Sequence, residues 1–322
     1  MSKQTRNRNL MNKSGKKQKK TDGNVRGTTA PWNPADSGDN RRKSDPKRPL
    51  GRSMGKSRGI KTHGGSPNRR DFGSEAAKEN WIWGHHAVKA ALENPRRTHH
   101  KLLVSKTMYE RLGDSIKGFP KEFKGELIKV HPSEIDDLLP DGAAHQGAAL
   151  KSAPLPDHDL DAIASPAKGL IIVLDQITDP HNVGAIFRLA AAFDAKAVVL
   201  QTRGAPPLAG AVTKVAVGTV ETVPHVLVTN IANSLLELQK MGWRVTGLAG
   251  EANITLQQAF QRAEAEVIVM GAEGPGLRKR VRDCCDQLAK IPMPGEAESL
   301  NVSTAAGIAL YEATRNIGRD MR

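Results

Sequence analysis

The stretch GLIIVLDQITDPHNVGAIFR, residues 169–188, decides the fold of this chain. Its first seven residues form an apolar run that ends in an aspartate, which is typical of a strand buried on both faces of a parallel sheet. A polar loop follows, and residues 182–193 have the pattern of a helix, with Asn182 as the expected N-cap. A buried strand that feeds a helix through a polar loop predicts an α/β domain.

The same alternation continues towards the C-terminus. Strands are expected at residues 197–200, 226–228, 243–248, 266–270 and 289–291, and helices at residues 231–241 and 302–315. This order predicts a parallel sheet covered by helices. Ligands of such sheets bind beyond the carboxyl ends of the strands, so the polar residues that follow these strands are the candidate site.

A smaller α/β unit precedes this domain. Its expected elements are a strand at residues 81–84, a helix at 86–92, strands at 101–105 and 126–130, and a helix at 133–139 that begins with Ser133 as its cap. The Pro-rich stretch 152–159 marks a linker. The domain boundaries are therefore placed at 79–153 for the small domain, 154–166 for the linker and 167–322 for the large domain.

Residues 1–78 have a different composition. They hold 21 of the 48 Lys and Arg but only 6 of the 34 Asp and Glu, a net charge of +15, whereas the rest of the chain has a net charge of −1. Few large apolar side chains interrupt this basic stretch, so we expect a disordered tail. It can increase the affinity for RNA non-specifically through counterion release, although a solvated extension without a role is the simpler alternative.

The cysteine content bears on the compartment. The two cysteines, Cys284 and Cys285, are adjacent, which suits neither a disulfide framework nor a zinc site. Neither a signal peptide nor an apolar run of membrane-spanning length is expected. The sequence thus favours a reducing cytoplasm and no membrane.

Three blocks of small and polar residues follow predicted strands. The first leads into a helix that carries Arg188, the second is MGAEGPGL at 270–277, and the third joins IPMPG at 291–295 to SLNVS at 299–303. Taken alone, the first block is better explained by a capped helix with a surface arginine, the second is equally compatible with an ordinary turn, and Asn301 and Ser303 of the third are compatible with simple helix caps, Ser303 most of all. The glycine order G-x-x-G-x-G differs from the dinucleotide fingerprint, so an NAD-dependent enzyme is disfavoured.

Taken together, the three blocks closely resemble the signature motifs of the SpoU (TrmH-type) RNA 2′-O-ribose methyltransferases of the SPOUT superfamily. The resemblance covers residues 169–315. The small domain is similar to the family's substrate-binding module, through GHHAV at 84–88 and QGA at 146–148. That module is typical of members that methylate a guanosine in bacterial 23S rRNA.

The resemblance implies a fold that periodicity alone does not predict. It implies a C-terminal trefoil-knotted methyltransferase domain, joined to a small α/β (L30e-like) N-terminal substrate-binding domain. It further implies S-adenosylmethionine as the cofactor, no metal, and a homodimer. The residues implied at the cofactor site are Gly271, Ile291, Leu300, Leu248, Gly250 and Met293.

The resemblance also implies residues for chemistry and for RNA. Arg188 occupies the position of the catalytic arginine; because a guanidinium is a poor base, we expect it to bind phosphate and stabilise the developing alkoxide. The residues expected to orient the reactants are Asn182, Glu273, Ser299 and Asn301. The residues expected to contact RNA are Lys214, Glu221, Gly84 and His86.

The stretch KVAVGTVE at 214–221 departs from the family pattern. It retains Lys214, Gly218 and Glu221, but it has Val217 and Thr219 where the family often shows Ser and Ala. This weakens the substrate assignment more than the activity. Three alternatives stay open: a tRNA 2′-O-methyltransferase, a resistance-type rRNA methyltransferase, and a non-catalytic RNA-binding assembly factor.

Overall fold

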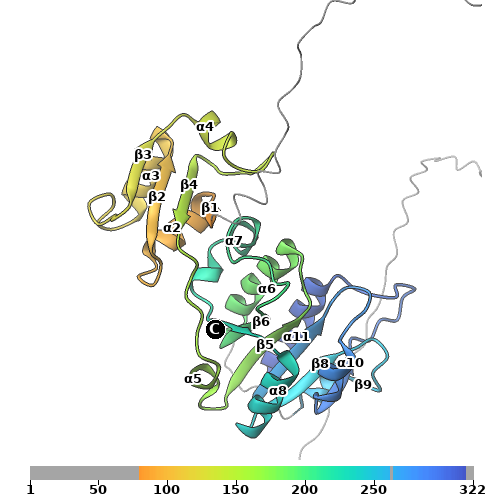
Figure 1. Cartoon of the computed structure of the whole chain (residues 1–322). Helices are drawn as coiled ribbons and strands as arrows, with labels where there is room; N and C mark the ends of the chain where they lie inside the picture. Colours follow the sequence, from red (N-terminus) through yellow and green to blue (C-terminus); the bar gives the residue numbers. More distant parts are fainter. Residues whose placement is uncertain (1–79, 262–263, 317–322) are drawn as a thin grey trace, which may run out of the picture. The chain divides into compact units, whose positions relative to one another are not determined.

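The computed structural model describes residues 80–261 and 264–316 of the chain (Figure 1). The basic tail expected at 1–78 lies outside these residues. Two sheets organise the described part, one in each predicted α/β unit. The small domain has a four-stranded sheet and the large domain has a seven-stranded sheet.

The sheet of the small domain has the order β1-β4-β2-β3. Its strands are β1 (Trp81–Trp83), β2 (His99–Val104), β3 (Glu126–Lys129) and β4 (Ala148–Ser152). Strands β2 and β3 are parallel, whereas β4 is antiparallel to β1 and to β2. The helices of this domain are α2 (His85–Glu93), α3 (Lys106–Ser115) and α4 (Pro132–Asp136).

The sheet of the large domain has the order β7-β6-β5-β10-β8-β11-β9, and its paired strands are all parallel. Its strands are β5 (Gly169–Asp175), β6 (Ala197–Gln201), β7 (His225–Val228), β8 (Arg244–Leu248), β9 (Ile254–Thr255), β10 (Ala265–Gly271) and β11 (Gln287–Lys290). The seven residues of β5 are all buried, as the apolar run predicted. The parallel sheet expected from the sequence is confirmed.

Helices cover both faces of this sheet. Alternate residues of β5 point to opposite faces, so Leu170, Ile172 and Leu174 enter one core and Ile171 and Val173 the other. The first core is covered by α6 (Pro180–Ala192), α7 (Ala211–Ala216), α9 (Leu256–Ala259) and α11 (Val302–Asn316). The second core is covered by α5 (Leu160–Ala164), α8 (Ile231–Lys240) and α10 (Lys279–Asp283).

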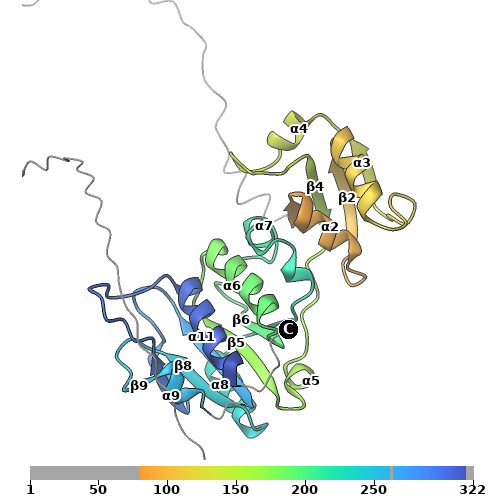
Figure 2. The same cartoon turned by 180° about the vertical axis from the view of Figure 1, so that it is seen from behind.

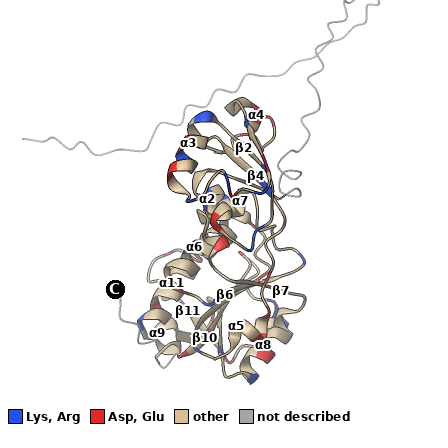
Figure 3. Cartoon of the chain, turned by 90° about the vertical axis from the view of Figure 1, so that its left-hand side faces the viewer, with Lys and Arg blue, Asp and Glu red and all other residues tan. Residues whose placement is uncertain are grey.

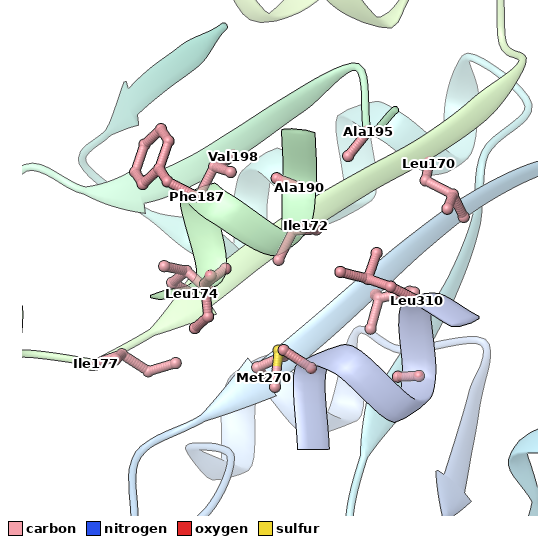
Figure 4. Close-up of a cluster of buried hydrophobic side chains, with 14 of the residues drawn as sticks. Leu170, Ile172, Leu174, Ile177, Phe187, Ala190, Ala195, Val198, Met270 and Leu310 are labelled. Atoms are coloured by element: carbon pink, nitrogen blue, oxygen red, sulfur yellow. The ribbon is translucent and has the colours of Figure 1, made fainter. Parts of the chain in front are cut away.

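The first core holds α6 and α11 together. Phe187 of α6 and Leu310 of α11 are buried against Ile172, Leu174 and Met270 of the sheet (Figure 4). The two helices lie side by side on the sheet (Figures 1 and 2). Residues near the start of α11 are therefore close to residues near the start of α6, although more than a hundred positions separate them in the sequence.

The ends of several elements differ from the sequence predictions. Asn182 does not cap α6, because Asp179 accepts hydrogen bonds from the backbone N–H groups of His181 and Asn182, and Pro180 takes the first helical position. Likewise His131, not Ser133, caps α4. The sequence reading missed the helix α3, the strand β4 and the short elements α5, α7, α9, α10 and β9.

Basic and acidic residues alternate in short stretches along the described ribbon (Figure 3), in keeping with the net charge of −1 for residues 79–322. The excess positive charge of the whole chain therefore lies outside residues 79–322. Among the described residues, no helix has the length and apolar character needed to span a membrane. Nor do these residues hold a group of three or more His, Cys, Asp or Glu suited to a metal ion.

Candidate active site

The three sequence blocks meet at the carboxyl ends of β5, β10 and β11. The first block is the loop 176–179 and the beginning of α6, the second is the loop after β10, and the third is the segment between β11 and α11. Because neighbouring parallel strands end at the same edge of a sheet, the three blocks are neighbours in space. The arrangement predicted from the sequence is confirmed in this respect.

Glu273 is the hub of the contact between the three blocks. Its Oε1 accepts hydrogen bonds from Asn182 Nδ2 at 3.1 Å and from Asn301 Nδ2 at 2.9 Å. Asn301 Nδ2 also donates to Asn182 Oδ1 at 2.9 Å, and the backbone N–H of Val302 reaches Glu273 Oε1 at 3.4 Å. One side chain from each block therefore joins a single polar cluster, which we call the Asn–Glu–Asn cluster (Asn182, Glu273 and Asn301).

Asn301 also caps a helix, and this second set of hydrogen bonds fixes the orientation of its side chain. Its Oδ1 accepts hydrogen bonds from the backbone N–H groups of Ser303 at 2.9 Å and Thr304 at 3.3 Å, so it caps α11. The amide oxygen therefore faces the helix and the amide nitrogen faces Glu273. This division leaves the side chain little freedom to turn.

Beside the cluster lies a cavity of about 510 Å³. Its walls are formed by the ends of β8, β10 and β11 and by the segment that precedes α11. The lining includes all six residues that the family resemblance implied at the cofactor site: Leu248, Gly250, Gly271, Ile291, Met293 and Leu300. Glu273, Ser299 and Asn301 also line it, so the predicted cofactor site and most of the predicted orienting residues are adjacent.

The loop after β10 explains its glycines. A Cβ on Gly271 would overlap the backbone of Gly276 and Leu277, so only glycine fits there. The loop turns back on itself through a bridge between Ala272 and Gly276, and Gly276 has a φ of 68°. This tight turn brings the backbone to the cavity wall and carries Glu273 into the cluster.

The walls of the cavity combine apolar side chains with carboxylates. Leu248, Met270 and Ile291 supply apolar surface, and Glu251 and Glu298 supply negative charge. Sequence analysis missed Glu251, which forms an ion pair with Arg282, also at the cavity. Its position directly after β8 and Gly250 was the available signal. Apolar walls with a few polar groups fit a nucleoside that carries a cationic amino-acid chain.

Arg188 does not join the Asn–Glu–Asn cluster. It lies two turns inside α6, is exposed, and has no hydrogen-bond or ion-pair partner within residues 80–261 and 264–316. Ser299 is also exposed, in the segment that leads to α11. Arg188 thus presents an unpaired guanidinium on the helix whose first turn holds Asn182.

Gly84 and Lys214, two residues predicted to contact RNA, lie together. Gln146 Oε1 accepts hydrogen bonds from Lys214 Nζ at 3.1 Å and from the backbone N–H of His85 at 3.0 Å. A Cβ on Gly84 would lie 2.6 Å from Lys214 Nζ, so glycine leaves room for this contact. Burial lowers the pKa of Lys214 below its ordinary value. His86 is exposed beside this group.

Glu221 does not lie with these residues. Its side chain is 2% exposed and forms an ion pair with Arg97, with Oε1 2.5 Å from Nη2. Asn94 Nδ2 donates to the same carboxylate at 2.8 Å. The structure thus places this carboxylate away from solvent, and both of its oxygens already accept hydrogen bonds.

Two family descriptions match the chain. Residues 169–311 match the SpoU rRNA Methylase family, and residues 81–157 match the RNA 2′-O ribose methyltransferase substrate binding domain. The first range lies within the large domain, and the second spans the small domain and the first residues of the predicted linker. Together they include all the residues of the candidate site.

Relatives with curated descriptions match most of the chain. The 23S rRNA (guanosine-2′-O-)-methyltransferase RlmB of Shewanella oneidensis is 41% identical over 243 residues, which cover 74% of this chain and 98% of that protein. The protein of the same description from Escherichia coli K12 is 39% identical over 239 residues, or 73% and 97% of the two chains.

Solved structures share the fold. The SpoU methyltransferase AviRb from Streptomyces viridochromogenes, in complex with the cofactor AdoMet, has a TM-score of 0.64 at 23% identity and covers 75% of this chain and 92% of its own. An rRNA methyltransferase from Sinorhizobium meliloti has a TM-score of 0.63 at 21% identity, with coverage of 75% and 90%.

Proposed function

The chain belongs to the SpoU rRNA methylase family, and we propose on this basis that it transfers a methyl group from S-adenosylmethionine to the ribose 2′-hydroxyl of a guanosine in 23S rRNA. The observation that carries the proposal is the Asn–Glu–Asn cluster at the wall of the cavity. It unites the three sequence blocks at one point. The relatives from Shewanella oneidensis and Escherichia coli, both 23S rRNA (guanosine-2′-O-)-methyltransferases, support the same substrate.

The cavity fits S-adenosylmethionine. Its residues Leu248, Ile291 and Leu300 would hold the adenine, and the backbone around Gly250 and Gly271 would supply polar contacts. When bound, the cofactor supplies an electrophilic methyl group and needs no metal. The protein therefore has to place a ribose hydroxyl in line and to help remove its proton.

We assign that help to Arg188 and the residues around it. A guanidinium stays protonated in proteins, so Arg188 would bind the phosphate of the target nucleotide and stabilise negative charge on the ribose oxygen. Its exposure and its lack of a described partner leave it available for RNA. Asn182, Asn301 and Glu273 would hold the pocket wall, and Ser299 would orient the reactants.

On the small domain, we propose that Gly84, His86 and Lys214 contact RNA. Lys214 Nζ contacts Gln146 and has no described carboxylate partner, which suits a phosphate. Glu221 was expected to contact RNA as well, but its paired, buried carboxylate supports a role in holding η1 (Thr219–Glu221). We propose the cytoplasm as the location, because the relatives act on rRNA.

We also propose a homodimer. Ile308 and Tyr311 of α11 are 38% and 50% exposed, and Leu189 of α6 lies beside Gly307. Exposed apolar side chains on α11, next to the partly buried Leu189 of α6, suit an interface that a second copy covers. Light scattering at micromolar concentration should give twice the chain mass; a monomer that retains full methyl transfer would refute the dimer.

The first experiment measures transfer of labelled methyl from S-adenosylmethionine to undermodified 23S rRNA and, in parallel, to bulk tRNA. Label in a 23S guanosine, mapped as a 2′-O-methyl stop, supports the proposal. Label in tRNA alone keeps the reaction and refutes the substrate. Cofactor binding with no label in either RNA favours the non-catalytic assembly factor.

A further inference from the structure

Asp175 and Arg278 form an ion pair between a buried carboxylate and a partly exposed guanidinium, outside the residues assigned to the site above. Asp175 is the last residue of β5 and is 0% exposed, and Arg278 immediately precedes α10. The carboxylate accepts two hydrogen bonds from this one arginine, from its backbone N–H at 2.9 Å and from Nε at 2.7 Å, and Nη2 lies 2.6 Å from Oδ1 as an ion-pair contact. A buried carboxylate with this much support is held in one orientation.

The pair joins the bases of two loops that carry the Asn–Glu–Asn cluster. Asp175 and Gly271 are paired positions in the register of β5 and β10, so the two loops begin at neighbouring points. One loop runs from Asp175 to the start of α6. The other runs from Gly271 to Arg278.

The same two loops are joined again at their far side. There Asn182 Nδ2 donates to Glu273 Oε1 at 3.1 Å. The loops therefore form a closed frame, with Asp175–Arg278 as one crossbar and Asn182–Glu273 as the other. Arg278 also extends the frame to β6, since its Nη2 donates to Gln201 Oε1 at 3.1 Å.

The frame matters because the Glu273 loop has little rigidity of its own. Gly274 and Gly276 have positive φ angles and no atom within 4 Å of an added Cβ, so packing does not hold them, and the described partners of the Glu273 carboxylate are all neutral N–H donors. No described cation holds this carboxylate. The position of Glu273 therefore depends on how firmly the ends of the loop are fixed.

We propose that Asp175 and Arg278 are positioning residues for methyl transfer. By fixing the base of both loops, they hold Glu273 within hydrogen-bond distance of Asn182 and Asn301 and set the cavity wall at residues 275–277. This inference rests on the proposed function. It predicts that breaking the Asp175–Arg278 pair weakens the contacts within the Asn–Glu–Asn cluster, although neither residue is among those that line the cavity.

The test is Asp175→Asn in the full-length protein, at a temperature where the variant is folded. Asparagine keeps the size of the side chain but removes the charge that Arg278 pairs with. We expect the Kd for S-adenosylmethionine, measured by calorimetry without RNA, to rise by about tenfold or more, and kcat to fall. Arg278→Lys, which keeps the charge but not the paired N–H donors, should give a smaller loss in both.

A matched control lies at the other end of β10. Glu266 is likewise 0% exposed and paired with an arginine, Arg244, but it lies at the edge of the sheet away from the site. Glu266→Gln should shift Tm and leave Kd and kcat within about twofold of wild type. A purely structural role for Asp175 predicts equal losses in the two variants, and that result would overturn the inference.

A double-mutant cycle tests directly whether Asp175 and Asn182 act through the same residue. Asp175→Asn and Asn182→Ala both act through Glu273, so their combined effect on Kd should be smaller than the product of the single effects. Independent effects, or a wild-type Kd in Asp175→Asn, would overturn the inference. If Asp175→Asn does not fold, Arg278→Lys decides in the same way. Because cofactor affinity is measured without RNA, a wrong substrate assignment leaves this test intact.

Discussion

Arg97 and Glu221 are 124 positions apart in the sequence and form an ion pair whose side chains are 0% and 2% exposed. Arg97 Nε donates to the second carboxylate oxygen at 3.2 Å, and Nη1 donates to the carbonyl oxygen of Ala153 at 3.0 Å. Asn94 completes the group through Glu221. Because Nε, Nη1 and Nη2 each donate a hydrogen bond and the side chain is fully buried, Arg97 ties three distant segments together without exposing a charge.

Removal of one member of this pair should destabilise the protein. Arg97→Met leaves the Glu221 carboxylate buried without its counter-ion, so we expect the free energy of unfolding to fall by about 3–5 kcal/mol in urea titrations. Arg97→Met combined with Glu221→Leu should recover much of this loss. A single variant within about 1 kcal/mol of wild type would contradict this account.

Arg188→Ala should separate chemistry from cofactor binding. Because Arg188 lies outside the Asn–Glu–Asn cluster, the Kd for S-adenosylmethionine should stay near that of wild type. Loss of a charge that stabilises the reacting oxygen should lower kcat by about 100-fold or more. Arg203→Ala, which removes another exposed arginine of the same domain, is the control and should retain activity. Equal activity of the two variants would exclude the role assigned to Arg188.

Gly271→Ala should abolish cofactor binding. The added Cβ would lie closer than 3.0 Å to the backbone of Gly276 and Leu277, so the loop has to shift away from the cavity wall. Calorimetry with S-adenosylmethionine measures the loss. Gly113→Ala is the matched control, because a Cβ there meets nothing within 4 Å, and its position inside α3 favours alanine by about 0.5–1 kcal/mol.

The titration of two buried groups should change the free energy of unfolding with pH in opposite directions. Burial lowers the pKa of His225 to about 4, with the neighbouring His158 adding to the effect, and it raises the pKa of Glu266 to about 7 against the hydrogen bond from Thr246 and the charge of Arg244. Between about pH 4 and 6.5, His225 is protonated in the unfolded chain but neutral in the folded chain. The free energy of unfolding therefore falls as the pH is lowered through this range. From about pH 4.5 to 7 the folded chain retains the proton of Glu266, so stability falls as the pH rises.

Single variants should reveal the pH dependence of stability that each group contributes. Where the two ranges overlap, the contributions largely cancel in the wild-type protein. Glu266→Gln should become more stable relative to wild type as the pH rises towards 7, and His225→Gln should become more stable relative to wild type as the pH falls towards 4. Each relative change should reach at most about 3 kcal/mol in urea titrations. Parallel profiles for wild type and both variants would show that neither pKa is shifted.

Local patterns in the sequence predicted the framework of the large domain well. The apolar run at 169–175 coincides with β5, and the small-residue helix predicted at 302–315 is α11. The polar residues at the strand ends do meet, as the geometry of parallel sheets requires. These elements were predictable because the pattern of apolar residues within a single segment is enough to identify a strand or a helix.

Features that depend on partners far along the chain were not predictable in this way. Glu221 was expected to contact RNA because its type and place matched a motif, but Arg97 buries it. Asp175 was recognised as the end of a strand, yet nothing near it in the sequence indicates its pairing with Arg278. The cap of α6 was misplaced by three residues because Asn182 and Asp179 both suit a cap, and only Pro180 separates the two possibilities.

The hydrogen bond between Asn182 and Asn301 spans 119 positions, so the Asn–Glu–Asn cluster is complete only when the segment that carries Asn301 is in place. Contacts between distant segments form late in folding, because the intervening chain has to be confined first. A nascent chain halted before Asn301 could pair β5 with β10 but would lack the segment that closes the cavity. Synthesis interrupted at that stage would therefore yield a protein that cannot retain its cofactor, and damaged or prematurely terminated copies could not modify ribosomes.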